Sequence, residues 1–152
     1  MTQNMLGASL KTCHWGYFDA TLPPAMTISS GDEVVINTVS GGPQNLPGPG
    51  FHVPQELLDL HEAGPPTMPG HILTGPVAVQ GAMPGDVLQI DILDVSFRQD
   101  WGFNHFGPLT GTLPQDFPNV HHTTIPLDAE RGIATLPWGL ELKLAPFFGV
   151  MG

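Results

Sequence analysis

The chain has 152 residues, of which 19 are glycine and 17 are proline; 41% are apolar and 12% are charged. So much Gly and Pro leaves little room for helices, while the apolar share supports a packed core, so the composition excludes both a helical bundle and a disordered segment. Four Lys and Arg against 14 Asp and Glu give a formal net charge of -10, which argues against a nucleic-acid partner.

No targeting or membrane segment is predicted. The longest apolar runs, such as residues 34–36, are short, and the N-terminus has neither a basic region nor an apolar stretch. The single cysteine, Cys13, cannot form an intrachain disulfide, which fits a reducing compartment. We therefore expect a cytoplasmic protein with no membrane partner.

Short segments rich in Val, Ile, Leu, Phe and Thr recur between Gly and Pro breakers, a pattern typical of a β-sandwich or barrel. Within residues 87–95, apolar and polar side chains alternate from Leu88 to Ile92, which predicts a half-buried strand with Asp91 and Asp94 on its solvent face or at its end. The pattern predicts strands over residues 25–29, 34–39, 75–79, 87–95, 132–136 and 140–144.

One segment, residues 53–62, is predicted to be helical, since Pro54 suits a first turn and acidic residues follow it. Residues 41–50 and 63–70 are too rich in Gly and Pro for a regular element and are predicted to be long connections. Residues 101–107 form a further aromatic loop, which either walls a small pocket or packs as a satellite cluster.

Two stretches repeat the order turn, Gly-Asp, apolar segment. Gly31-Asp32 leads into the first and Gly85-Asp86 into the second. Glycine can take a positive φ, and the Asp side chain can bond nearby amides, so both aspartates are interpreted as turn residues. The repeat indicates either a duplication or a hairpin used twice.

Seven histidines against four Lys and Arg make imidazole the best lead to chemistry. No two have the spacing that puts a pair of ligands on one element, so a metal site would have to be assembled across the fold. His14 and His71 have the most distinctive surroundings, although a buried imidazole bonded to backbone is the commoner environment for a histidine. The pair His121-His122 is predicted to lie in a surface loop. The histidines are His14, His52, His61, His71, His105, His121 and His122.

The sequence gives little support for a catalytic cysteine or serine nucleophile. If the segment around Cys13 and His14 is extended, the two side chains point to opposite faces and cannot share a proton, so Cys13 is interpreted as a small buried residue. The sequence also has no G-x-S-x-G elbow, P-loop or G-x-G-x-x-G fingerprint.

Four segments resemble acetamidase/formamidase proteins in order and spacing, across essentially the whole chain. They are CHWGYFD at 13–19 with Pro23 and Pro24, SGD at 30–32, HILTGPV at 71–77 running into GAMPGDVL at 81–88, and PFFGVMG at 146–152.

The resemblance implies a mainly β fold, a β-sandwich of jelly-roll or CUB-like character with long Gly/Pro-rich loops and little helix. It implies hydrolysis of short linear amides, such as formamide or acetamide, to the acid and ammonia, assisted by a divalent metal ion with zinc as the first choice. By position, His14 and His71 are the expected metal ligands and Asp19 the expected catalytic carboxylate. Met83 stands where the family has an acid, so it is given no role.

Members of that family are about twice as long as this chain, which ends in an apolar stretch at 144–152. We therefore expect a single β domain over residues 1–152 that corresponds to the N-terminal half of a truncated or split protein. Its expected partner is a second copy or a chain carrying the C-terminal half. The alternative is a non-catalytic metal- or small-molecule-binding β-sandwich domain. A blue-copper site is disfavoured because Cys13 precedes every histidine.

Overall fold

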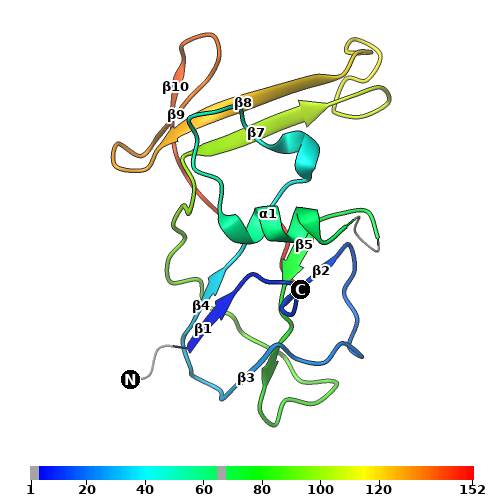
Figure 1. Ribbon diagram of the computed structural model, residues 1–152. Helices are drawn as coiled ribbons and strands as arrows, with labels where there is room; N and C mark the ends of the chain where they lie inside the picture. The colour runs from blue at the N-terminus through cyan, green and yellow to red at the C-terminus, as the bar shows by residue number, and fades with distance from the viewer. Residues whose placement is uncertain (1–3, 65–67) are drawn as a thin grey trace. The chain divides into compact units, whose positions relative to one another are not determined.

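The computed structural model describes residues 4–64 and 68–152 (Figure 1). These residues form ten strands, one α-helix and one 3-10 helix, and the strands pair into four small sheets. The prediction of a mainly β fold with little helix is confirmed. In this described part of the chain, no helix is long and apolar enough to cross a membrane.

The chain divides into two compact units, and each is described by itself. The first comprises Met1–Gly41, Pro54–Asp94 and Phe148–Gly152; the second comprises Gly42–Val53 and Val95–Phe147. A single β domain over residues 1–152 stays a prediction.

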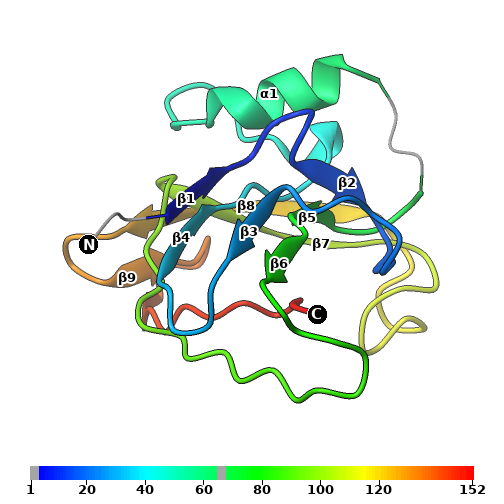
Figure 2. The same cartoon turned by 90° about the horizontal axis from the view of Figure 1, so that it is seen from below.

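Three pairs of short strands make up the sheets of the first unit (Figure 2). Two of these pairs are parallel, β1 with β4 and β3 with β6, and the third, β2 with β5, is antiparallel. The predicted strands at 25–29, 34–39 and 75–79 are confirmed, with shorter bounds. The six strands are β1 (Asn4–Gly7), β2 (Cys13–Trp15), β3 (Met26–Ile28), β4 (Val34–Asn37), β5 (Ile72–Thr74) and β6 (Val77–Val79).

The predicted helix is confirmed as α1 (Gln55–Glu62). Pro54 occupies its N-cap, where the missing N–H costs no helical hydrogen bond. Leu57 and Leu60 are fully buried, and their i, i+3 spacing places them on one face of the helix. The connection predicted at residues 63–70 follows α1, and its residues 65–67 lie outside the described part of the chain.

The repeated Gly-Asp turn has the same geometry in both copies. The Asp32 carboxylate accepts a hydrogen bond from the amide of Ser29 at 2.9 Å, and the Asp32 amide donates to the Ser29 carbonyl at 3.1 Å. Asp86 makes the same two bonds with Met83, at 2.8 and 3.0 Å. Both aspartates are therefore turn residues, as predicted.

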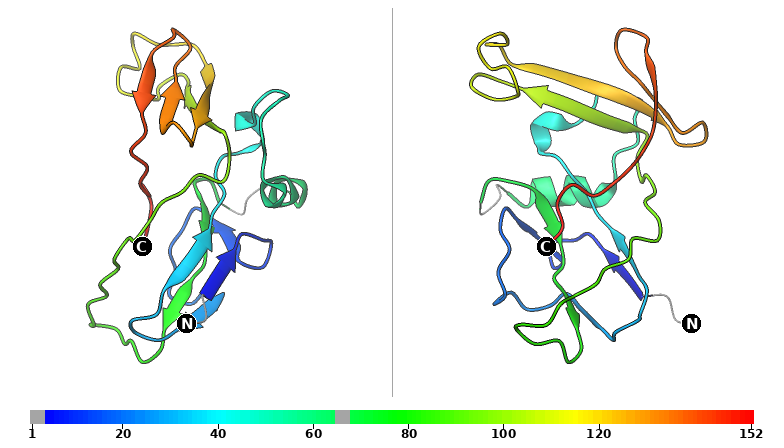
Figure 3. Two further views of the ribbon diagram at one scale, coloured as in Figure 1. Left: turned by 90° about the vertical axis from the view of Figure 1, so that its left-hand side faces the viewer. Right: turned by 180° about the vertical axis from the view of Figure 1, so that it is seen from behind.

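The strand predicted over residues 87–95 is wrong. No strand forms there, and the ribbon runs on as an extended connection (Figure 3). Val87 is 96% exposed and Ile90 54%, so the segment is not half-buried on either face. Alternation describes which way side chains point, whereas a strand also requires a neighbour that accepts its backbone hydrogen bonds.

The second unit contains an antiparallel sheet in the order β10-β9-β8-β7 and the short 3-10 helix η1 (Pro43–Asn45), a small departure from the irregular connection predicted there. The strands predicted at 132–136 and 140–144 are confirmed as β9 and β10. The four strands are β7 (Trp101–Phe106), β8 (His121–Asp128), β9 (Ile133–Thr135) and β10 (Glu141–Lys143).

Two predicted loops of this unit are strands instead. Residues 101–107 contain β7, and His121-His122 opens β8, with His105 opposite His122. The glycines of 101–107 indicated a loop, but Trp101, only 1% exposed, anchors the strand and donates its indole N–H to the His52 carbonyl at 2.8 Å. Tertiary burial thus outweighs the low strand propensity of glycine.

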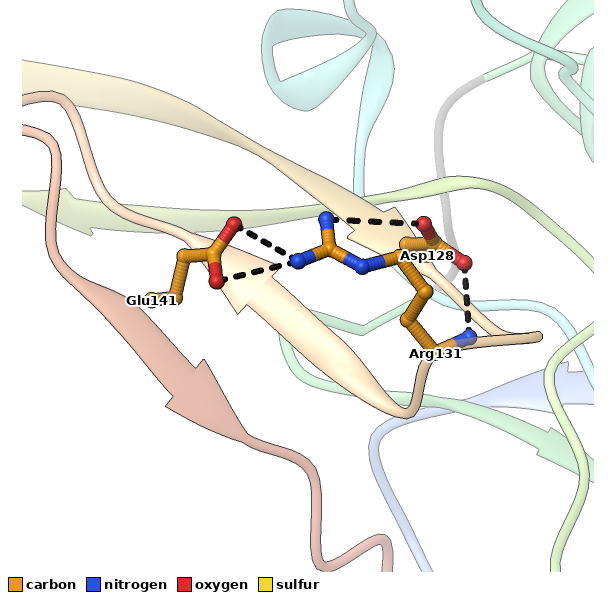
Figure 4. Close-up of polar contacts among 3 residues, drawn as sticks. All are labelled: Asp128, Arg131 and Glu141. Carbon is orange, nitrogen blue, oxygen red and sulfur yellow. Dashed lines mark hydrogen bonds and ion pairs between the residues drawn. The ribbon is translucent and has the colours of Figure 1, made fainter.

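Charged side chains hold the β8–β9 turn to β10 (Figure 4). The Arg131 guanidinium lies 3.1 Å from both carboxylate oxygens of Glu141, and the Arg131 amide donates to the Asp128 carboxylate at 2.9 Å. All three side chains are exposed, so this network links the edge of the sheet in water rather than in the core.

Candidate functional site

The two expected metal ligands lie on one strand ladder. β2 and β5 pair so that His14 is opposite Leu73, and the Gly16 amide donates to the His71 carbonyl at 3.0 Å, extending the ladder by one step. Opposite residues share a face of an antiparallel ladder, as do residues two apart on one strand. His14 and Leu73 therefore share a face, and His71, just outside β5 and 57 positions after His14, continues that face diagonally from His14.

The His14 ring is held by the backbone. Its Nε2 lies 3.0 Å from the Tyr17 carbonyl oxygen, and the His14 and Tyr17 rings are 5.2 Å apart. A carbonyl only accepts hydrogen bonds, so Nε2 carries the hydrogen, and the neutral ring keeps a lone pair on Nδ1. Metal-binding histidines are commonly oriented by such a bond to a carbonyl, so His14 fits a ligand role.

His71 is exposed at the position just before β5. Among the described residues, no side-chain hydrogen bond or ring contact holds its imidazole. Both ring nitrogens are thus accessible to a ligand, which also fits a role in metal binding.

Backbone contact shapes this end of the ladder. Gly16 has a φ of +77°, and a Cβ there would overlap the Pro69 carbonyl oxygen. A Cβ on Gly70 would lie 2.9 Å from the Gly16 Cα. Only glycine at these two positions lets the segment before His71 lie this close to the end of β2.

A small hollow opens beside His71. Its volume is about 130 Å³, and its wall is mostly apolar. Sites for drug-sized ligands measure roughly 300–1,000 Å³, so this one admits only a molecule of a few heavy atoms. It is lined by Gly16, Tyr17, Phe18, Gly70, His71, Leu73 and Val150.

Asp19 directly follows Phe18, which lines this hollow, and its side chain closes a turn with Thr21. Its carboxylate accepts hydrogen bonds from the Thr21 amide at 2.8 Å and the Thr21 hydroxyl at 2.7 Å. The amide bond, and then the hydroxyl bond, hold the pKa of the Asp19 carboxyl below its ordinary value. Asp19 is therefore a carboxylate at neutral pH, and its catalytic role stays a prediction.

Cys13 lies on β2 next to His14, so the two side chains point to opposite faces, as predicted. Its sulfur lies 3.5 Å from the Thr74 hydroxyl, and the residue is half-buried rather than fully buried. Cys13 packs against β5 and does not serve His14.

Sequence spacing did not reveal two other histidine environments. The His61 Nε2 donates to the Gly41 carbonyl at 3.0 Å, while its buried Nδ1 has no partner among the described residues. His105 and His122 face each other across β7 and β8, with rings 6.4 Å apart. Only the strand register could have disclosed that second pair.

No complete metal site is present within residues 4–64 and 68–152, because no three His, Cys, Asp or Glu side chains are grouped closely enough to hold an ion. His14 and His71 thus supply two possible ligands and not a full set. A larger hollow of about 280 Å³, lined in part by Ser9, Lys11 and Asp59, contains no histidine.

Comparison with known proteins adds two findings. The model of the Acetamidase/Formamidase family matches residues 9–152. A formamidase from Methylophilus methylotrophus is 56% identical over 69 residues, which make up 36% of this chain and 17% of that protein. The match therefore covers well under two thirds of that relative's length.

Proposed function

The chain belongs to the acetamidase/formamidase family, and from that premise we propose that it serves in the hydrolysis of short linear amides such as formamide and acetamide. The reaction adds water to the amide and releases the carboxylic acid and ammonia. The similarity to a formamidase supports this substrate class, although it covers only part of either chain. An amide of three or four heavy atoms suits a hollow of about 130 Å³.

The single observation that supports the site is the β2–β5 register, which sets His14 opposite Leu73, while His71 and Leu73 line that hollow. We propose these imidazoles as two ligands of a divalent ion. Zinc is the preferred candidate because imidazole nitrogen is one of its usual ligands. Water, substrate or a partner's side chains would fill the remaining positions.

A divalent ion bound there would act as a Lewis acid toward the amide carbonyl and lower the pKa of a bound water. The chain's own residues then have distinct tasks. The Tyr17 carbonyl keeps the His14 ring in one tautomer, and Phe18, Leu73 and Val150 surround the substrate's small apolar end. The Asp19 carboxylate, proposed from its position in the sequence, would carry a proton to the leaving nitrogen.

The partner is part of the same proposal. Two imidazoles do not complete a site, and the match to the formamidase covers only 17% of that protein. We propose that it acts as a homo-oligomer or together with a polypeptide carrying the C-terminal half.

Ammonia release from formamide and acetamide tests the function. The chain would be assayed with zinc, with zinc and a chelator, and after mixing with the C-terminal half of the Methylophilus methylotrophus formamidase. We expect metal-dependent release in at least one mixture. Metal binding without turnover in any mixture would overturn the amidase proposal and favour the non-catalytic metal-binding domain.

A further inference from the structure

Two histidines of the second compact unit lie directly opposite each other. β7 and β8 run side by side as an antiparallel ladder (Figure 1), and the register sets His105 against His122. Their ring centroids are 6.4 Å apart. Neither residue has a part in the proposed amide hydrolysis, so the two imidazoles are possible metal ligands that still have no role.

This pair occupies a non-hydrogen-bonded position of the ladder, where facing side chains approach most closely. The Leu127 amide donates to the Asp100 carbonyl at 2.8 Å, which makes those two residues a hydrogen-bonded pair. The two kinds of pair alternate along an antiparallel ladder, so His105 and His122, an odd number of residues further along, are of the other kind. Pro126 falls at a non-hydrogen-bonded position of the same series, as it must, because proline has no N–H to donate.

The His122 ring is held in place but lacks a partner for one nitrogen. Phe103 stacks on this ring, with centroids 6.0 Å apart and an angle of 19° between the planes. The His122 Nε2 is buried and has no hydrogen-bond partner among the described residues. A buried polar atom without a partner is costly and uncommon, and a bound ion or water is one way to satisfy it. With its hydrogen on Nδ1, the ring has a lone pair on Nε2 for a metal ion.

His105 offers the second nitrogen and the freedom to reach an ion. Its side chain is exposed, and in the part of the chain that the structure describes no side-chain hydrogen bond holds its ring. Ring nitrogens lie on the rim, so the gap between them is shorter than the distance between centroids once the ring turns. Two metal–nitrogen bonds of about 2.0–2.1 Å each reach across roughly 4 Å. We expect rotation of the His105 side chain to bring both imidazoles onto one ion.

The donor atoms indicate the class of ion. Residues 101–106 and 121–127 contain no Asp, Glu or Cys, and among the described residues no third such ligand is grouped with the two histidines. Imidazole nitrogen suits copper, nickel and zinc, whereas magnesium and calcium prefer oxygen. Zinc sites use three or four protein ligands, while copper(II) and nickel(II) accept tetragonal sets of nitrogen and oxygen ligands. The net charge of -10 also favours the approach of a cation.

We propose that His105 and His122 form a metal site for copper(II) or nickel(II), with water in the remaining positions. Phe103 keeps the His122 imidazole in place, and the bound ion links β7 to β8. This inference does not rest on the proposed function, because the site uses neither His14 nor His71.

Broadening of backbone NMR signals by paramagnetic copper(II) tests the site. Copper chloride would be added in steps to the metal-free, isotope-labelled chain, up to two equivalents, which allows for a second ion elsewhere. We expect the amide signals of residues 104–106 and 121–123 to broaden, because these residues surround the ion. No broadening of these signals by two equivalents would overturn the inference.

Two matched variants identify the ligand. His105→Ala should need about tenfold more copper, or more, for the same broadening, because one of two imidazoles is lost. His121→Ala removes an exposed histidine next to His122 whose side chain points to the other face, and it should titrate as the unchanged chain does. Equal effects of the two substitutions, or no effect of His105→Ala, would show an adventitious ion only and overturn the inference.

Thermal unfolding guards against a misfolded variant. Without metal, both variants should unfold close to the midpoint of the unchanged chain, because both side chains are exposed. With copper, the midpoint should rise for the unchanged chain and for His121→Ala, and rise less for His105→Ala, since an ion that binds only the folded state stabilises it. An equal rise in all three would contradict the pairing.

His71→Ala separates this site from the proposed amidase centre. In this variant, copper resonance spectra should still show nitrogen coupling from two imidazoles, and residues 104–106 and 121–123 should broaden as before. Loss of that broadening in His71→Ala would overturn the inference. Copper binding at these residues without ammonia release from any mixture would keep the site and reject the amidase activity.

Discussion

His14 and His71 share a strand face but are held very differently. The His14 ring is fixed by the Tyr17 carbonyl, with its Nδ1 lone pair available, while the His71 ring is exposed. A ligand that is already oriented loses little conformational freedom on binding, whereas a mobile one must be ordered. In the proposed metal site, His14 would thus be the ligand already in place and His71 the ligand that has to be ordered when an ion binds.

Replacing His71 tests whether it binds metal together with His14. His71→Ala should weaken zinc binding by about tenfold or more, because one of two imidazole ligands is lost, while the fold stays intact since the side chain is exposed. Zinc affinity by calorimetry and bound zinc by elemental analysis measure the effect. His105→Ala, an exposed histidine on β7, is the control. Unchanged zinc content in His71→Ala would remove His71 from the site.

Asp19 gives a prediction about pH. Its pKa is lowered by the bonds from Thr21, so the carboxylate form is favoured in the folded state. This contribution to stability is present above the pKa of an unfolded Asp and is lost as the pH falls through the lower, folded pKa. An NMR titration should show Thr21→Ala raising the Asp19 pKa toward its ordinary value. Thr27→Ala on β3 should leave it unchanged; an equal shift in both variants would contradict this cause.

Alanine substitutions at two glycines with a positive φ distinguish the cost of backbone strain from the cost of a steric clash. Gly31→Ala should cost about 1 kcal/mol of unfolding free energy, because φ is +87° but the space around it is open. Gly16→Ala should cost roughly 3 kcal/mol, since a Cβ also meets the Pro69 carbonyl. Urea unfolding measures both. Equal losses would show that the backbone before His71 can move aside.

At the scale of elements, the Arg131 network joins the β8–β9 turn to β10, yet its side chains are 42 to 60% exposed. Arg131→Ala should therefore lower the unfolding free energy by less than about 1 kcal/mol, and the loss should shrink at about 1 M salt. Lys143→Ala on β10 controls for the lost positive charge. A salt-independent loss of several kcal/mol would show that the network carries the sheet edge.

Local patterns predicted the elements whose partners lie within the chain. The helix at α1 and the strands β3, β4, β6, β9 and β10 were all expected near their observed bounds. The segment 87–95, in which apolar and polar residues alternate from Leu88 to Ile92, forms no strand. Its side-chain pattern is a local property, whereas its hydrogen bonds depend on a neighbour that these residues cannot provide.

For the whole molecule, the large exposed surface predicts weak dependence of stability on denaturant. The m-value for urea scales with the surface newly exposed on unfolding, so it should lie in the lower part of the usual range of about 1–3 kcal/mol/M. A value in the upper part of that range for the chain alone would contradict the small buried core.

Residue types in a fixed local order were enough to predict a mainly β fold, the repeated Gly-Asp turns, the helix at α1 and the family. They also singled out His14 and His71. Pairing in space sets His14 opposite Leu73 on the face that His71 continues and puts His105 opposite His122; it leaves residues 87–95 with no strand partner among residues 4–64 and 68–152. Register and pairing join residues far apart in the chain, and a one-residue shift would turn every side chain to the other face, so no local pattern determines them.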